Sequence, residues 1–193
     1  MSDELPSFLI EAGELLQHVS RTTYFGRSGF NRYDDPARGY GVFYVGLDLP
    51  TALMESVFHK HQWLSEKKRV ISLKEVQNRM VRAIGVLSTL RLADLTAPGV
   101  MASVLGLNLE QLASRDYAHT QQVSALVHDM MGVDAQPRFD GILYPSRNNY
   151  PAASVALFER SRVKIKVFKD IDLVDHVDWP SFVARYRIGI QST

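Results

Sequence analysis

Short runs of aromatic and β-branched residues, separated by turn-forming residues, are the feature that most constrains the fold of this chain. The clearest run covers residues 41–45, Gly-Val-Phe-Tyr-Val, and predicts a buried strand. Further strands are expected at 18–22, 70–73, 87–95, 139–144, 153–158 and 163–170. Because helical segments lie between some of these strands, we expect a single α+β domain with a mixed β-sheet core and flanking helices.

Helical periodicity is clearest at residues 118–131, where apolar side chains recur on one stripe. Gly132 is the expected C-cap of that helix. Asn108, with Gln111 three residues later, has the pattern of a helix N-cap. Residues 98–132 as a whole are therefore expected to form the helical part of the chain. Other helices are expected at 7–18, 50–61 and 180–186.

Composition places the chain among ordinary globular proteins. It has 193 residues and a mass of 21.8 kDa, with 46% hydrophobic and 22% charged residues. Residues 1–193 are therefore expected to form one domain. The net charge of +1 gives no overall field that would attract nucleic acid, so no direct contact with nucleic acid is expected. Residues 66–69, Glu-Lys-Lys-Arg, form either a local basic patch or a solvated turn.

The absence of cysteine excludes disulfides, thiol catalysis and Cys-ligated zinc. The first residues, Met-Ser-Asp-Glu-Leu-Pro, lack the basic and apolar regions of a signal peptide. No stretch approaches the roughly 18 uninterrupted apolar residues of a membrane span. We therefore expect a cytoplasmic protein without membrane contact. His59 and His61 stand two apart in an expected helix, where such residues do not face each other, so no metal site is expected.

Residues 24–39 form a loop rich in Gly, Asn, Asp, Arg and Pro. The loop also contains tyrosine, phenylalanine and arginine residues, which a simple linker would not need. Long loops inside compact domains are often functional. Arg32 is its candidate site residue. A structural alternative is an ion pair between Arg32 and Asp34 or Asp35 that pins the loop.

Glu55 and Ser146 are two further polar residues placed near expected strand ends. Glu55 lies on the first turns of the helix that follows residues 41–45, and Ser146 follows the expected strand 139–144. Polar groups carried by strand ends and their loops are the usual way in which a rigid scaffold builds a site. Each residue has a structural alternative. Glu55 could be the exposed side of its helix, and Ser146 could be a turn residue that bonds its own backbone.

The order of these elements resembles the RES domain, a family named for its Arg, Glu and Ser. The matching elements, in chain order, are a strand with Arg21, the loop with Arg32 and Tyr33, the strand that contains Tyr44, the helix with Glu55, and the Asp140-Gly141 strand that leads to Ser146 and Arg147. These elements span residues 17–170. The pair Phe30-Asn31 stands before Arg32, where many family members have two glycines.

The resemblance implies an ADP-ribosyltransferase-like fold that binds NAD as a substrate in a central cleft, with no further cofactor. Such enzymes cleave the N-glycosidic bond between nicotinamide and ribose. The catalytic residues would be Arg32, Glu55 and Ser146. Arg32 would hold the pyrophosphate, because a guanidinium offers planar, bidentate donors. Glu55 would bond the ribose hydroxyls and stabilise the oxocarbenium-like charge.

The same resemblance assigns the residues that contact NAD. Tyr44 or Tyr33 would pack against the nicotinamide ring, and Arg21 would be a further NAD-binding residue. Ser146 has no base beside it in the sequence, so we expect it to hydrogen-bond the ribose or a phosphate rather than to attack. Arg147 is either a second phosphate contact or a surface charge. Tyr44 has the alternative of an ordinary core residue.

RES proteins are commonly toxins paired with an Xre-type antitoxin that carries a helix-turn-helix. The resemblance therefore implies a bacterial type II toxin–antitoxin system, with an antitoxin that covers the NAD cleft and a toxin that dimerises. NAD degradation is the preferred interpretation, with water as acceptor in a hydrolase or phosphate in a phosphorylase. A protein side chain as acceptor would make the chain an ADP-ribosyltransferase. A catalytically inert RES fold that only binds a partner protein is the non-enzymatic alternative.

Overall fold

The computed structural model describes residues 5–20, 26–58, 69–108, 110–111, 114 and 116–192. These residues build an eight-stranded sheet in the order β1-β6-β7-β8-β3-β2-β5-β9 and a two-stranded sheet of β10 and β4. The strands are β1 Ser7–Ile10, β2 Leu15–Ser20, β3 Val42–Gly46, β4 Val70–Ser72, β5 Met80–Val86, β6 Leu90–Asp94, β7 Gly141–Pro145, β8 Ala153–Phe158, β9 Ile165–Asp172 and β10 Gly189–Gln191. The helices are α1 Leu49–Ser56, α2 Leu73–Gln77, α4 Ala118–Asp129 and α5 Trp179–Arg185, with short π- or 3-10 helices η2 Val100–Val104, η3 Glu159–Lys164 and η4 Leu173–Asp175.

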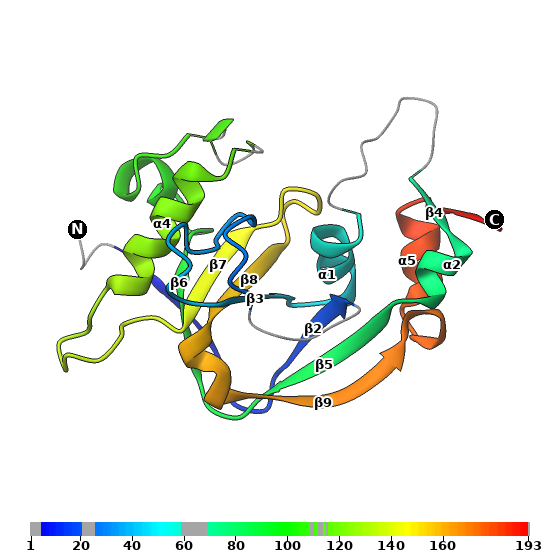
Figure 1. The fold of residues 1–193 in the computed structure, drawn as a ribbon, viewed down its shortest axis with the longest axis horizontal. Coiled ribbons are helices and arrows are strands. Elements are labelled where there is room, and N and C mark those ends of the chain that lie inside the picture. The colour runs from blue at the N-terminus through cyan, green and yellow to red at the C-terminus, as the bar shows by residue number, and fades with distance from the viewer. Residues whose placement is uncertain are drawn as a thin grey trace.

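The large sheet is mixed and curled, with helices at both of its ends (Figure 1). Its neighbouring strands run antiparallel except β6 and β7, which are parallel. α4 packs against β7, whereas α1 packs against β2 and β3. Buried apolar side chains form separate clusters under α4, under α1 and α5, and between the strands themselves. The sheet therefore has a different helical cover at each end.

β3 and α1 form the unit that positions the candidate site. The chain leaves β3 at Gly46, where a Cβ atom would lie 2.7 Å from the carbonyl oxygen of Asp48. Glycine permits this tight exit from the strand. The Asp48 side chain then caps α1 by accepting a hydrogen bond from the N–H of Thr51 at 2.7 Å. Pro50 occupies the first turn, where its missing N–H costs no hydrogen bond. α1 therefore begins directly after the strand and brings Glu55 close to the sheet.

The segment 7–18, expected as a helix, forms two strands instead. β1 pairs with β6, and β2 pairs with β5. The turn between them includes Gly13, whose φ of +95° favours glycine. The side chain of Leu15 is 47% exposed and that of Leu16 only 1%, because successive side chains of a strand point to opposite faces. The helical prediction was wrong because cross-strand partners far along the chain decide the conformation of this segment.

Other boundaries also differ from the sequence-based expectations. α1 ends at Ser56 rather than near residue 61, and residues 59–68 lie outside the described residues. β6 begins at Leu90, not at residue 87. β5, α2 and β10 were not predicted. Gly132 does not cap α4, because the helix ends at Asp129 and Met130 is already extended.

Several sequence predictions are confirmed. β3, β4, β7, β8 and β9 lie within two residues of the expected strands, and α5 within one of the expected helix. Asn108 and Gln111 form the predicted reciprocal cap. The Asn108 N–H donates to Gln111 Oε1, and the Gln111 N–H donates to Asn108 Oδ1, each at 2.8 Å. These features are local, so the sequence around each one is sufficient to define it.

In the part of the chain that the structure describes, no helix is both long and apolar enough to cross a bilayer. Among the same residues, no group of three His, Asp or Glu side chains could hold a metal ion. His59 and His61 lie outside the described residues, as do residues 66–68 of the charged segment. Arg69, the last residue of that segment, is 6% exposed, so it adds little to any basic surface.

Candidate active site

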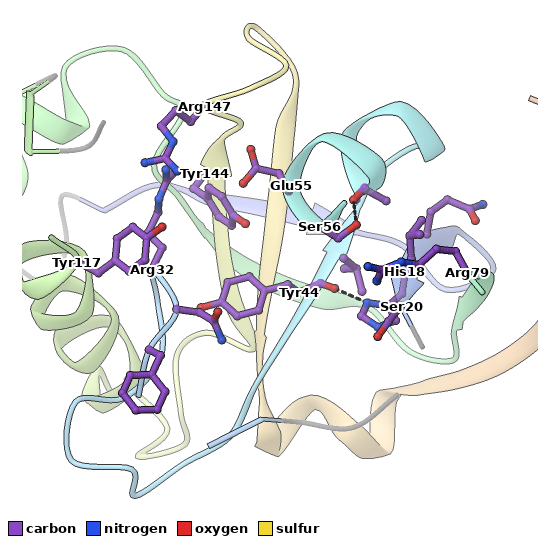
Figure 2. A pocket seen from close by; sticks show the side chains of 17 residues that line it. His18, Ser20, Arg32, Tyr44, Glu55, Ser56, Arg79, Tyr117, Tyr144 and Arg147 are labelled. Atoms are coloured by element: carbon purple, nitrogen blue, oxygen red, sulfur yellow. Dashed lines mark hydrogen bonds between the residues drawn. The ribbon is translucent and has the colours of Figure 1, made fainter. Parts of the chain in front are cut away.

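A cavity of about 650 Å³ opens between α1, β2, β3 and the loop that follows residue 26. Figure 2 shows Arg32, Tyr117 and Arg147 on one side of it, and His18, Ser20 and Arg79 on the other. Glu55 and Tyr144 lie between these two sides (Figure 2). The lining residues are Gln17, His18, Val19, Ser20, Phe30, Asn31, Arg32, Tyr44, Val45, Gly46, Ala52, Glu55, Ser56, Arg79, Tyr117, Tyr144 and Arg147. One carboxylate thus shares a cavity with several cationic and aromatic side chains.

Glu55 is held in place by Ser146, which approaches from the end of β7. The Ser146 hydroxyl donates a 2.6 Å hydrogen bond to Glu55 Oε1 and accepts one from the N–H of Asn149 at 3.0 Å. Because that N–H occupies the acceptor side of the hydroxyl, the hydroxyl proton is directed at the carboxylate. Ser146 is only 1% exposed and does not line the cavity. It therefore supports Glu55 from behind.

A second layer of hydrogen bonds fixes Asn149 in turn. Its side-chain amide donates to Thr51 Oγ1 at 3.0 Å, at the start of α1, and accepts from the hydroxyl of Tyr186 at 2.5 Å. The neighbouring Asn148 donates to the carbonyl oxygen of Met54 at 3.3 Å. The turn that carries Ser146 is thus tied to the helix that carries Glu55. This connection sets the carboxylate in one orientation.

Arg32 lies near two tyrosine rings. Its guanidinium carbon is 5.9 Å from the ring centre of Tyr144 and 6.0 Å from that of Tyr117. A guanidinium near an aromatic face is attracted by the ring quadrupole. Burial raises the pKa of Tyr144 well above its ordinary value; the charge of Glu55 raises it further and that of Arg32 lowers it. Tyr144 is therefore a neutral phenol in the field of both charged groups.

The loop around Arg32 is organised by the buried carboxylate of Asp34, which is 1% exposed. This carboxylate accepts hydrogen bonds from the hydroxyl of Ser28, from the N–H and side-chain amide of Asn31 at 3.1 and 3.0 Å, and from the hydroxyl of Tyr44 at 3.0 Å. The Tyr44 oxygen in turn accepts from the N–H of Tyr33 at 2.8 Å. The Asp34 side chain thus bonds to its own loop and to β3, and the conformation that places Arg32 at the cavity depends on it.

Contacts from α4 hold the same loop from the other side. The side-chain amide of Gln121 donates to the carbonyl oxygens of Gly29 and Asn31, at 2.9 and 3.0 Å. Asp35 closes the far end of the loop by accepting from the N–H groups of Ala37 and Gly39. Among the described hydrogen bonds, both aspartates bind donors of the loop and its surroundings rather than Arg32. Arg32 itself lines the cavity, and the ion pairs found among the described residues do not join it to Asp34 or Asp35.

The structure brings most of the sequence-predicted residues to one place. Arg32, Tyr44, Glu55 and Arg147 line the cavity. Ser146 and Tyr33 are buried directly behind it. The Tyr33 ring packs 4.6 Å from that of Tyr144, and Arg147 also donates to the carbonyl oxygen of Ser114 at 3.2 Å. Burial, the largest cause, raises the pKa of Tyr33. Arg21 lies outside the described residues.

Several cavity residues were not predicted. Tyr144 stands two residues before Ser146, and the two-residue period of a strand could have placed both on one face. His18 stands on β2, where its ring nitrogen Nδ1 donates to the carbonyl oxygen of Tyr44 at 2.8 Å, because a carbonyl can only accept. Tyr117 and Arg79 reach the cavity through tertiary packing, and no local sequence signal marks them.

The curled mixed sheet and its helices form a single α+β domain that is consistent with an ADP-ribosyltransferase-like fold. The family model of the RES domain matches residues 14–180, most of the chain. The chain therefore belongs to the RES domain family, which is associated with toxin–antitoxin systems and with NAD. No curated protein matches the chain.

Proposed function

We propose that this protein is a toxin that degrades NAD by cleaving the bond between nicotinamide and ribose. The observation that carries the proposal is the Glu55 carboxylate, presented to the cavity by Ser146 and placed across Tyr144 from Arg32. A dinucleotide needs both kinds of group, a cation for its pyrophosphate and an anion near the ribose carbon that becomes positive. The cavity supplies both within one space of about 650 Å³.

In the proposed reaction, Arg32 binds the pyrophosphate, with Arg147 as a second cation beside it. The aromatic ring of Tyr44, which is half-buried at the cavity, offers a surface for the nicotinamide. When the bond between the ribose carbon and the pyridinium nitrogen breaks, both electrons leave with the nitrogen. The cationic ring then departs as neutral nicotinamide and needs no proton. The departure leaves positive charge on the ribose carbon, which the Glu55 carboxylate stabilises.

The acceptor completes the reaction by forming a new bond from its oxygen to the ribose carbon and releasing a proton. Water gives ADP-ribose, and inorganic phosphate gives ADP-ribose 1-phosphate. Ser146 acts in this scheme by orienting Glu55, since its hydroxyl already donates to the carboxylate. NAD is the substrate, and the scheme needs no metal or further cofactor. We also propose an Xre-type antitoxin that covers the cavity, a toxin dimer and a bacterial cytoplasmic location, all from family membership.

The test is nicotinamide release from NAD by the purified protein, with and without inorganic phosphate. Glu55→Gln is the key variant, because it removes the charge while it keeps the shape; we expect its rate to fall about 100-fold or more. Glu14→Gln, at an exposed glutamate of the turn before β2, is the matched control and should retain full activity. Product analysis in the two buffers identifies the acceptor.

A cellular experiment separates the proposal from its rivals. Intracellular NAD is measured after the chain is induced without an antitoxin, beside the Glu55→Gln variant. A rapid fall in NAD that the variant does not cause supports NAD degradation. Growth arrest with unchanged NAD would point to modification of a protein target. Normal growth with unchanged NAD would leave a binding module and overturn the proposal.

A further inference from the structure

Phe30 is a large aromatic residue that lines the cavity while 75% of its surface is exposed. The other aromatic residues around the cavity, Tyr44, Tyr117 and Tyr144, are buried or half-buried. The Phe30 ring therefore offers an exposed apolar surface in the same cavity as the charged groups of Arg32 and Glu55. Its position makes it a candidate contact for whatever the cavity binds.

Neighbouring residues of the loop hold Phe30 in its position. The guanidinium carbon of Arg38 lies 5.5 Å from the centre of the Phe30 ring. Arg38 has a φ of +59°, in the left-handed region that side chains rarely adopt, and a Cβ on Gly29 would be 3.3 Å from Arg38 Nε. The N–H of Phe30 donates to the Ser28 hydroxyl at 3.2 Å. The loop thus holds Arg38 against the ring, while most of the ring surface remains exposed.

Phe30 also has a fixed relation to the cationic side of the cavity. It stands two residues before Arg32, and both side chains line the same cavity. Two residues span at most about 7 Å of backbone, so the Phe30 ring and the Arg32 guanidinium project from the same short stretch of the loop. A ligand whose pyrophosphate contacts Arg32 and whose first ribose lies near Glu55 would bring its second base close to Phe30.

We propose that Phe30 is the platform on which the adenine base of the dinucleotide stacks. The cavity would then select an adenine dinucleotide over a mononucleotide that ends at the phosphate. This inference rests on the proposed function, which assigns the nicotinamide end to Glu55. Stacking of a base on an aromatic ring is tolerant of base identity but requires a flat apolar surface, so alanine should weaken binding by about tenfold, or about 1.4 kcal/mol.

The experiment measures KM and kcat for NAD and for nicotinamide mononucleotide, which lacks the adenosine half. In the Phe30→Ala variant, KM for NAD should rise about tenfold while kcat stays unchanged, and KM for the mononucleotide should not change. Phe30→Trp keeps a flat ring and should restore the KM for NAD. Phe168→Ala, at a 76% exposed phenylalanine on β9, is the matched control and should match the wild type. If Phe30→Ala raises KM equally for both substrates, or does not change KM for NAD, the proposal that adenine stacks on Phe30 is wrong.

A binding measurement separates this inference from the proposed function. ADP-ribose is titrated calorimetrically into Glu55→Gln and into the double variant that also carries Phe30→Ala. If the wild type releases no nicotinamide but ADP-ribose binding still depends on Phe30, the cleavage proposal fails and the adenine platform stands. If ADP-ribose does not bind, or binds equally to both variants, the platform is wrong whatever the activity.

Discussion

Ser146 donates a 2.6 Å hydrogen bond to Glu55 from a position that is only 1% exposed. The two residues are 91 positions apart in the sequence, one after β7 and the other on α1. The N–H of Asn149 holds the acceptor side of the Ser146 oxygen at 3.0 Å, so the hydroxyl can donate in only one direction. Ser146 thus orients the Glu55 carboxylate.

Ser146→Ala should therefore lower kcat while leaving KM for NAD within about twofold of the wild type. Loss of one hydrogen bond to a charged group predicts a decrease of about tenfold in kcat, or about 1.4 kcal/mol. Ser146→Thr keeps the hydroxyl and should recover most of the rate. Steady-state nicotinamide release measures both constants. A large rise in KM with unchanged kcat would instead show that Ser146 contacts the substrate.

Arg32→Lys tests the shape of the cation as well as its charge. Lysine keeps the positive charge but loses the planar pair of donors and the stacking beside Tyr144 and Tyr117. We expect KM for NAD to rise roughly tenfold in Arg32→Lys and further in Arg32→Ala. Arg162→Lys, at an exposed arginine of η3, is the matched control. If Arg32→Lys behaves like the wild type, charge alone is sufficient.

Asp34→Asn should destabilise the fold, because an amide cannot accept all the donors that surround this buried carboxylate. The Ser28 and Tyr44 hydroxyls and the Asn31 amide would lose part of their shared acceptor. Hydrogen bonds to charged groups typically contribute about 1.5–3 kcal/mol, so we expect a decrease of about 2 kcal/mol in the free energy of unfolding. Urea denaturation measures it. Asp116→Asn, at an exposed residue, should leave the midpoint unchanged.

Gly141→Ala should be far more damaging than Gly85→Ala. A Cβ on Gly141 would overlap the carbonyl oxygen of Ala156 on β8 and lie 3.0 Å from the Cα of Leu157. At Gly85 the nearest atom would be 3.8 Å away, an ordinary contact. We expect Gly141→Ala to lower the free energy of unfolding by about 3 kcal/mol or to prevent folding, with little change for Gly85→Ala. Similar stability of the two variants would contradict the close approach of β7 and β8.

Alkaline pH should destabilise the fold through its buried and half-buried tyrosines. Burial raises the pKa of Tyr40 to about 12 and those of Tyr44 and Tyr144 well above the ordinary value of 10. A tyrosine whose pKa is higher in the folded than in the unfolded protein contributes to the free energy of unfolding. This contribution is fully present below about pH 10 and is lost as the pH rises through the folded pKa. Urea denaturation from neutral to strongly alkaline pH should show the loss. Tyr40→Phe should reduce the slope of the free energy of unfolding against pH. An unchanged slope would show that Tyr40 does not contribute to this pH dependence.

The strands that carry the site could be predicted because their apolar runs are continuous. β8 has the bounds expected from the sequence, and its side chains from Ser154 to Phe158 are all buried. The N-terminal segment could not be predicted in this way. Leu15 and Leu16 fit a loose helical spacing, but pairing of β2 with β5 decides their conformation, and β5 itself was missed. Long-range pairing thus overrides the local pattern.

The candidate site could be predicted only in part from the sequence, for a similar reason. Arg32 and Glu55 were selected because the order of the elements that carry them resembles the RES domain, and neither position alone was sufficient to indicate a site. The placement of Ser146 behind Glu55 depends on how the end of β7 meets α1, and the contact of Tyr117 with Arg32 depends on how α4 packs over the loop. Such relations between distant segments arise only in the folded sheet.

The place of β8 in the sheet has a consequence for the timing of activity during synthesis. β8 lies between β7, which leads to Ser146, and β3, which leads to Glu55. It is made after both of them, at residues 153–158. A ribosome-bound chain in which Arg32, Glu55 and Ser146 have already been synthesised still lacks β8, the strand that joins β7 to β3 in the sheet. Under the proposed function, translation products that end before residue 153 should therefore release no nicotinamide from NAD, and only a chain that includes β8 should be active.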